Sequence, residues 1–343
     1  MASPSSATVR PVPGPPVPIG LSVATLQALG LPFSLDVARL GQELGYRSLW
    51  VAEAVGPEAF ATLGAVTQAA PELDLATGVL ALQLRTPPLL AMAGATLQAL
   101  APEREVILGV GISSPVVAGR WHGAGYGPRP LAQVREFVTL LRECLSGERV
   151  DFEGDFYKVA GFRLGVRLGE RRPKIVIGAL NQGMLRLAGE VADGLLLNYL
   201  PASHVPWSVE QVRKGGDATV YAYVHVGVCR REDGIQAARR DLFSYAVVDA
   251  YARNFAEAGY GDEVASVRER HAAGDREGAV AAVSDAMVDG IDVMGDAAHV
   301  RATVDAYVEG GVEVPIVFPL PWAPDRMAVV DATLRAAIGA GAA

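Results

Sequence analysis

The sequence predicts an α/β protein folded as a (β/α)8 TIM barrel with insertions after strands 4 and 7. Apolar runs of strand length alternate with longer segments of helical period, which is typical of repeated βα units and a parallel sheet. Eight such strands can be counted, and eight favour a closed barrel. An open dinucleotide-binding sheet would carry G-x-G-x-x-G after its first strand, and "GLSVATLQALG" (20–30) lacks that pattern.

The first half of the chain contains four of these strands. In order, we expect a strand at 18–24, a helix at 34–46, a strand at 47–53, a helix at 57–70, a strand at 73–82, a helix at 87–100 and a strand at 105–112. Ser34 stands where a capping side chain would begin the first helix. Pro57 stands where proline fits the first position of the second helix.

The second half resumes the alternation after a glycine-rich loop. A helix at 129–147 ends at Gly147, and "RVDFEGDFYKV" (149–159) reads as an inserted hairpin. We then expect a strand at 174–179, a helix at 183–192, strands at 194–200 and 219–228, a long helical stretch at about 234–290, a helix at 296–310, a strand at 314–321 and a helix at about 325–338.

Composition narrows the class of protein. Residues 1–17 are rich in proline and serine and predict a disordered or extended arm, which leaves 18–343 as a single barrel domain. The net charge of −8, with no long basic run, argues against nucleic acid and anionic membranes as partners. Cys144 and Cys229 are far apart, which fits a reducing compartment, and no apolar window is long enough to span a membrane. We therefore expect a cytoplasmic protein.

In such a barrel, functional side chains gather where strands end. Glu53 follows strand 2, where it is either a general base or hydrogen-bond acceptor for a bound ring, or only a solvated carboxylate. His122, in "GRWHGAGYG", lies in the loop after strand 4 and is a candidate catalytic or ring-contacting residue. His225 lies within strand 7, where a hydrogen-bonded core histidine is the stronger interpretation. Since neither a metal cluster nor a nucleophile motif is present, we expect a cofactor to supply the chemistry.

Five segments, in this order and spacing, resemble the bacterial luciferase-like monooxygenase superfamily. They are "LGYRSLWVAEA" (44–54), "LATGVLALQLRTPPLLA" (75–91), "TLQALAPEREVILGVG" (96–111), "GERVDFEGDFYKV" (147–159) and "IVIGALNQGMLRLAGEVADGLLLN" (175–198). The chain looks most like the branch that uses the deazaflavin coenzyme F420, and "PIVFPLP" (315–321) is similar to the last strand of these barrels.

The resemblance implies a cofactor in the barrel mouth and a homodimer formed through helices 57–70 and 87–100. It implies a non-prolyl cis peptide at Gly78-Val79 that backs the cofactor ring, and it assigns Glu53 a contact with the ring or its hydroxyls. It places the coenzyme phosphate at the loop after strand 5, which is the segment "IGALNQGM". The implied cofactor-binding set is Glu53, Gly78, Val79, Ala81, Gly111, Ser113, Gly178, Ala179, Leu180, Asn181, Gln182, Gly183 and Met184.

Two positions depart from the pattern of the family's sugar-phosphate dehydrogenases. Those enzymes carry a histidine after the strand 2 acid and a glutamate after strand 4, where this chain has Ala54 and Ser114. Because that acid/base pair is missing, we do not expect a sugar-phosphate substrate.

The leading hypothesis is an oxidoreductase that transfers a hydride between reduced F420 and a small organic substrate. The proton would come from His122 or a tyrosine. An FMN-dependent monooxygenase that uses oxygen and a partner reductase is the alternative. A ligand-binding barrel without turnover stays open as a third reading.

Overall fold

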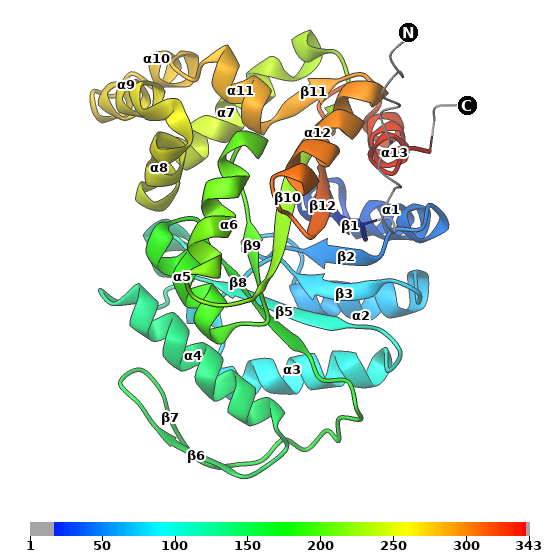
Figure 1. The fold of residues 1–343 in the computed structure, drawn as a ribbon, viewed down its shortest axis with the longest axis vertical. Coiled ribbons are helices and arrows are strands. Elements are labelled where there is room, and N and C mark those ends of the chain that lie inside the picture. Colours follow the sequence, from blue (N-terminus) through cyan, green and yellow to red (C-terminus); the bar gives the residue numbers. More distant parts are fainter. Residues whose placement is uncertain (1–16, 341–343) are drawn as a thin grey trace, which may run out of the picture.

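The computed structural model describes residues 17–340, so the arm expected at 1–17 lies almost wholly outside the described residues. Eight parallel strands form a closed barrel (Figure 1). They are β1 (Gly20–Ser22), β2 (Ser48–Val51), β3 (Asp74–Thr77), β5 (Val106–Gly111), β8 (Lys174–Gly178), β9 (Gly194–Leu197), β10 (Thr219–Val228) and β12 (Val314–Pro319). The ring closes because β1 pairs with β12, with Leu21 opposite Val317. The predicted barrel is confirmed.

The alternation of side chains along each strand divides the core into two layers. On β2, Trp50 packs inside the barrel with Tyr221 and Tyr223, while Leu49 and Val51 belong to the layer between strands and helices. The interior is filled mainly by buried apolar side chains. The barrel is therefore solid, and a ligand can enter only at the mouth formed by the carboxyl ends of the strands.

Helices cover the barrel between successive strands. They are α1 (Leu31–Glu43), α2 (Ala59–Ala69), α3 (Pro87–Leu100), α4 (Pro130–Leu145), α5 (Gln182–Val191), α6 (Val205–Arg213), α12 (Ala297–Glu309) and α13 (Arg326–Ala337). Two expected starts were wrong. Ser34 lies inside α1, which begins after Gly30 with a proline in its first turn. Glu58, rather than Pro57, precedes α2 and caps it by accepting the Ala61 N–H.

The inserted hairpin is confirmed as antiparallel strands β6 (Val150–Glu153) and β7 (Lys158–Phe162). It lies along the outside of α4 (Figure 1). The Glu136 carboxylate on α4 accepts the backbone N–H groups of Asp155, Phe156 and Tyr157 at 2.7–2.9 Å, which fixes the turn.

The stretch from 234 to 290 is helical but divided. It contains α7 (Arg231–Ala246), α8 (Asp249–Phe255), a π-helical turn (Ala256–Tyr260), α9 (Gly261–Ala272), α10 (Arg276–Ala281) and α11 (Asp285–Ile291). Gly259 and Gly274 have φ of 103° and 80°, which the sequence permits because glycine has no Cβ. These helices enclose a second apolar core beside the barrel.

Short elements complete the architecture. They are 3₁₀ turns at Ala24–Leu29, Leu82–Leu84 and Ala202–His204, a π-helical turn at Pro115–Trp121, and strands β4 (Leu80–Ala81) and β11 (Val293–Gly295). Helix α6 and strand β11, which pairs with the end of β10, were not expected from the sequence.

Candidate active site

The floor of the mouth is the peptide between Gly78 and Val79, which is cis as the resemblance implied. The Gly78 N–H donates to the Val51 carbonyl at 2.7 Å, and the Gly78 carbonyl accepts the Tyr223 hydroxyl at 2.6 Å. A Cβ at Gly78 would lie 2.2 Å from that hydroxyl, so only glycine fits here. Hydrogen bonds to the neighbouring strand β2 and to β10 across the barrel therefore hold this segment in place.

Glycines on the neighbouring strands make room for the Val79 side chain. A Cβ on Gly109, Gly111 or Gly178 would lie 3.0–3.2 Å from the methyl groups of Val79. Ala81, on β4, pairs with Gly111, and Ser113 follows two residues later at the mouth, half-buried. The structure thus brings together Gly78, Val79, Ala81, Gly111, Ser113 and Gly178 at the carboxyl ends of β3, β4, β5 and β8. We call the Gly78–Val79 peptide with the Val79 side chain the Val79 platform.

The loop after β8, the fifth strand of the barrel, presents a row of unpaired backbone N–H groups. The backbone N–H groups of Leu180, Asn181, Gln182 and Gly183 have no hydrogen-bond partner among residues 17–340. Unpaired N–H groups at the start of a ten-residue helix, together with its dipole, suit an anion.

The other members of the expected anion set are already engaged. The Ala179 N–H donates to the Leu196 carbonyl, and the Met184 N–H donates to the Asn181 carbonyl. The Asn181 amide donates to the Ala250 carbonyl on α8 at 3.2 Å, while the Gln182 amide donates to Gln211 on α6. The donors available to an anion are therefore the four backbone N–H groups, because the side-chain amides of Asn181 and Gln182 already donate within the protein.

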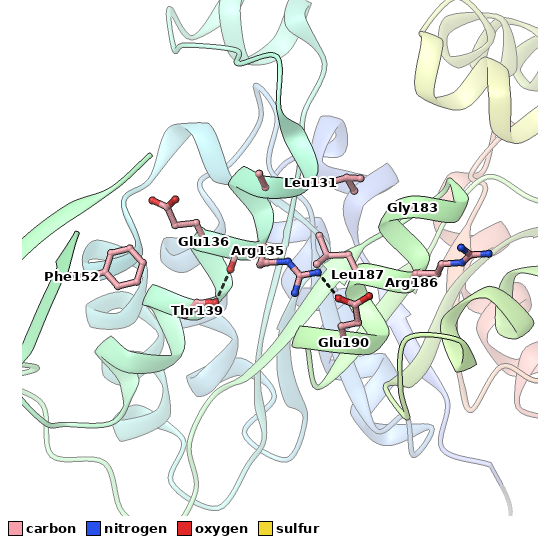
Figure 2. A pocket seen from close by; sticks show the side chains of 10 residues that line it. Leu131, Arg135, Glu136, Thr139, Phe152, Gly183, Arg186, Leu187 and Glu190 are labelled. Carbon is pink, nitrogen blue, oxygen red and sulfur yellow. Dashed lines mark hydrogen bonds and ion pairs between the residues drawn. The ribbon is translucent and has the colours of Figure 1, made fainter. Parts of the chain in front are cut away.

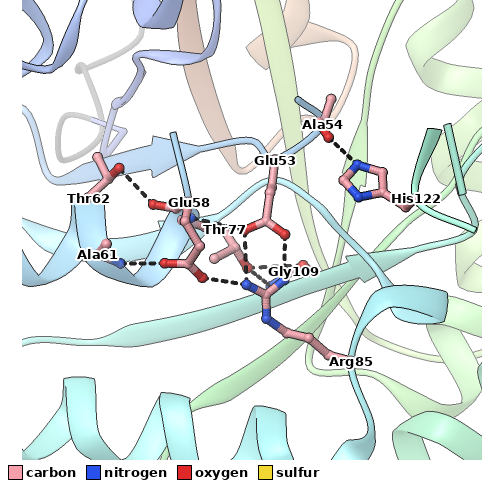
Figure 3. Close-up of polar contacts among 10 residues, drawn as sticks. Glu53, Ala54, Glu58, Ala61, Thr62, Thr77, Arg85, Gly109 and His122 are labelled. Atoms are coloured by element: carbon pink, nitrogen blue, oxygen red, sulfur yellow. Dashed lines mark hydrogen bonds and ion pairs between the residues drawn. The ribbon is translucent and has the colours of Figure 1, made fainter. Parts of the chain in front are cut away.

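Glu53 is held by an arginine that the sequence reading did not single out (Figure 3). Its carboxylate accepts two hydrogen bonds from Arg85, at 2.5 and 3.0 Å, and one from the Ala59 N–H at the start of α2. Arg85 also binds Glu58, and the Arg85 and Glu53 side chains are only 14% and 12% exposed. Arg85 is the single cation between β3 and α3, and this is the sequence feature that could have identified it.

Burial disfavours the charged carboxylate of Glu53, but the hydrogen bonds from Arg85 and Ala59 outweigh it and lower its pKa. Glu53 lies two residues beyond the end of β2, and its carboxylate accepts the Ala59 N–H at the start of α2, so it points toward the helical layer. In this arrangement, Glu53 is an ionised anchor for α2 and Arg85.

His122 lies against the same loop. Its Nε2 atom is 2.5 Å from the Ala54 carbonyl, so the loop after strand 4 touches the loop after strand 2 (Figure 3). Since a carbonyl oxygen only accepts, Nε2 carries the hydrogen and Nδ1 is left free to hold or release a proton. The side chain is exposed at the rim of the mouth.

A second polar cluster lies across the mouth. His225 is 1% exposed and stands between Asp292, with Oδ1 3.0 Å from Nδ1, and Asn198, with Oδ1 2.9 Å from Nε2. The expected hydrogen-bonded core histidine is therefore present, and it also faces the barrel interior, where it stacks on Phe318. Burial lowers the pKa of His225 to about 4 and raises that of Asp292 well above its usual range.

Tyrosines extend this cluster toward the helical insertion after strand 7. Tyr199 has φ of 50° and donates its hydroxyl to Asp241 at 2.8 Å. Its ring packs on Tyr245, with centroids 3.9 Å apart, and on His225. Burial, with a smaller contribution from Asp292, raises the pKa of Asp241 to about 7. Asn198 and Tyr199 directly follow β9, at a strand end where functional side chains are expected, but no sequence pattern marks Asp241 or Asp292.

A groove of about 640 Å³ runs between α4 and α5 on the outer face of the barrel (Figure 2). Gly183, Leu131 and Leu187 line it together with the ion pair between Arg135 and Glu190. This groove lies between helices, outside the strands, and it shares Gly183 with the row of unpaired N–H groups at the start of α5.

Across residues 17–340, no group of three or more His, Cys, Asp or Glu side chains is placed to hold a metal ion. In the same range, no helix is both long and apolar enough to cross a membrane.

Known proteins with this arrangement identify the family. The model of the luciferase-like monooxygenase family matches residues 16–313, which is most of the chain. The chain belongs to the luciferase-like monooxygenase family. The mouth described above is therefore the mouth of a luciferase-like barrel, as the sequence segments suggested.

The relatives of this luciferase-like protein include proteins named for coenzyme F420. A Mycobacterium tuberculosis protein, named as a candidate coenzyme F420-dependent oxidoreductase, is 26% identical over 311 residues, covering 82% of this chain and 89% of its own. The 5,10-methylenetetrahydromethanopterin reductase of Archaeoglobus fulgidus is 29% identical over 262 residues, covering 70% and 75%. In fold, the chain is similar to the F420-dependent tetrahydromethanopterin reductase of Methanopyrus kandleri, with a TM-score of 0.78, 18% identity, and coverage of 94% of this chain and 99% of that one.

Proposed function

We propose that this protein is a coenzyme F420-dependent oxidoreductase that transfers a hydride between the coenzyme and a small organic substrate. The observation that carries the proposal is the row of four unpaired N–H groups, Leu180 to Gly183, beside the Val79 platform. Such a row suits a phosphate, and the platform suits a flat ring. A relative that aligns along 82% of this chain is named for F420.

The residues of the chain have separate tasks in this proposal. When bound, reduced F420 supplies the hydride. Val79 and Gly78 support the ring, and the start of α5 holds the phosphate. The Glu53–Arg85 pair fixes the loop after strand 2, on which His122 rests through the Ala54 carbonyl. His122 Nδ1 then holds the proton that accompanies hydride transfer, and Glu53 acts by positioning.

A fluorescence titration with oxidised F420 and, separately, with FMN tests the proposal. The informative variant is Gly183→Asp, which places a negative charge among the four donors, with Gly183→Asn as its uncharged control of equal size. A Cβ at Gly183 would lie 3.2 Å from the exposed tip of Leu131, so both variants should fold. We expect micromolar binding of F420, weakened at least tenfold in Gly183→Asp and far less in Gly183→Asn.

Preference for FMN would replace the proposal by the monooxygenase alternative. Binding of neither compound would contradict it. Equal affinities in the aspartate and asparagine variants would move the phosphate away from α5.

We further propose that the protein is a homodimer joined through α2 and α3. These two helices pack side by side and contain no charged residue. On α3, Leu89, Met92 and Leu100 are each about half exposed, which is costly for large apolar side chains in water. Light scattering after gel filtration should give a dimer for the wild type and a monomer for Met92→Glu, while Leu31→Glu on α1 stays dimeric. A monomeric wild type would refute this assignment.

A further inference from the structure

Asp292, His225 and Asn198 form a line from the protein core to the barrel mouth. Asp292 is fully buried, His225 is 1% exposed and Asn198 is half-buried. Asp292 Oδ1 lies 3.0 Å from His225 Nδ1, and His225 Nε2 lies 2.9 Å from Asn198 Oδ1. The line therefore has one sealed end and one open end.

The chemistry of the two contacts fixes where the protons lie. Burial keeps His225 neutral, so only one of its nitrogens carries a hydrogen. Burial also favours the protonated form of Asp292, whose hydroxyl can donate to Nδ1. His225 Nε2–H then donates to its one hydrogen-bond partner within residues 17–340, the Asn198 carbonyl oxygen. Every contact in the line has one donor and one acceptor in this arrangement.

The same arrangement leaves the Asn198 NH2 group as the open end. Nδ2 makes no hydrogen bond to the described part of the chain, and it is not sealed from solvent as the orphaned Asp292 Oδ2 is. His225 cannot tilt to release the amide, because Phe318 stacks on one side of its ring at 4.1 Å and the Tyr199 ring approaches at 4.3 Å. An amide held in this way has a fixed orientation.

The position of Asn198 is that of a ligand-contacting group. Leu196 faces the interior and pairs with Tyr221, and β9 ends with Leu197 opposite Ala222, so Asn198, the residue directly after β9, continues this register toward Tyr223. Tyr223 holds the Gly78 carbonyl of the platform. Asn198 therefore follows an interior-facing residue at the level where anything bound over Val79 would lie.

We infer that Asp292 and His225 are positioning residues that turn the Asn198 amide so that its NH2 group is a fixed hydrogen-bond donor for a carbonyl-type oxygen bound in the mouth. The inference deepens the proposed function and rests on it for the identity of the ligand. Two sources of that oxygen are open: a ring carbonyl of the coenzyme, or a carbonyl of the substrate.

Asn198→Asp tests the donor, because it keeps the size of the side chain and replaces the NH2 group by an acceptor. The matched control is Gln42→Glu, the same chemical change on α1, far from the mouth in sequence and accepting the Glu72 N–H through an oxygen that the variant retains. Two probes are used: F420 by fluorescence titration, and cyclohexanone by saturation-transfer NMR, with and without F420.

A tenfold or greater loss of F420 affinity in Asn198→Asp, absent in Gln42→Glu, places the oxygen on the coenzyme. Unchanged F420 affinity with loss of the cyclohexanone signal places it on the substrate. If Asn198→Asp binds F420 and cyclohexanone as the wild type does, the donor role is overturned. The same conclusion holds if F420 affinity is unchanged and neither protein binds cyclohexanone. If the wild type itself fails to bind F420, the proposed function fails, while the ketone arm still tests Asn198.

The positioning role has its own readout in the ligand-free protein. In protein labelled with ¹⁵N-histidine, the His225 signals, identified by their loss in His225→Gln, should show a neutral ring with the proton on Nε2 between pH 6 and 8. The titratable groups that face this ring or its neighbours are Asp292, Tyr199, Asp241, Tyr245 and Tyr251. A proton on Nδ1, or a doubly protonated ring, would overturn the support role whatever the ligand proves to be.

Discussion

The two polar clusters at the mouth each hold a largely buried carboxyl group, and they do so in opposite ionisation states. The Glu53–Arg85–Glu58 cluster, on the side of strands 2 and 3, is ionised, and each carboxylate is paired with the guanidinium. The His225–Asp292–Asn198 cluster, on the side of strands 6 and 7, is neutral and sealed only at its Asp292 end, and Tyr199 links its His225 ring to Asp241. The first faces the helical layer and the second faces the barrel interior. The difference teaches that charge is kept where a partner of opposite charge reaches it, and that acids without such a partner retain their protons.

The clusters should therefore respond oppositely to pH. Asp241 has a folded-state pKa of about 7 against an ordinary 3.8, so between these values the folded state binds a proton that the unfolded state lacks. Its contribution to stability falls as pH rises from about 4 to 7, by on the order of 4 kcal/mol. Urea unfolding of Asp241→Asn should lose this pH dependence relative to the wild type, because asparagine still accepts the Tyr199 hydroxyl. Parallel stability curves for the two proteins would break the comparison.

Removal of the Arg85 guanidinium should destabilise the protein through the Glu53–Arg85–Glu58 cluster. In Arg85→Met, Glu53 stays buried without its partner, and we expect a loss of about 2–3 kcal/mol in unfolding free energy at pH 7. Because the Glu53 pKa is lowered in the folded state, this pair stabilises above the usual carboxylate pKa and its contribution disappears as pH falls through the lowered value. The double variant Arg85→Met/Glu53→Gln should recover part of the loss. If it does not, the charge of Glu53 is not the cause.

Tyr223, on β10, connects the strand that carries His225 to the Val79 platform, because its hydroxyl donates to the Gly78 carbonyl. Tyr223→Phe removes the donor to the buried Gly78 carbonyl, which should cost about 1–2 kcal/mol and loosen the platform. Thermal unfolding and the F420 titration would be measured together. Unchanged affinity with reduced stability would limit the bond to a structural role.

His122 should contribute least to stability, because its ring is exposed and makes one hydrogen bond. We expect His122→Ala to change the unfolding free energy by less than about 0.5 kcal/mol. If His122 is the proton carrier, turnover of any substrate found should nevertheless fall, with F420 affinity retained. A variant that turns over as fast as the wild type would remove His122 from the proposal.

Local pattern was sufficient for most of the fold. Helix α3 has the predicted bounds because Thr86 caps it and Pro87 and Pro88 occupy its first turn. The hairpin was visible in its Glu-Gly-Asp turn. Helix α6 was missed because its nine residues include a proline and are too few to show a clear helical repeat of apolar residues. Strand β11 was missed because three residues are too few to show the alternation of a strand.

The site was predictable in position but only partly in partners. Strand ends located Glu53, Gly78 and the loop at Asn181, because barrel topology brings those ends together. The partner Arg85 is 32 residues from Glu53, and Asp292 is 67 residues from His225. No local pattern encodes such pairings, since they arise only when the ring of strands and the insertion after strand 7 pack together.

The closure of the ring has a consequence during protein synthesis. Strand β1 pairs through Leu21 with Val317 on β12, so one of its edges has no partner until the ribosome has made almost 300 further residues. At about 5–20 residues per second, that edge stays open for roughly 15 to 60 seconds. Until then the nascent chain carries an unpaired parallel edge at each end of a growing, open sheet. We expect this interval, rather than any later event, to be the time at which the chain most needs protection from aggregation.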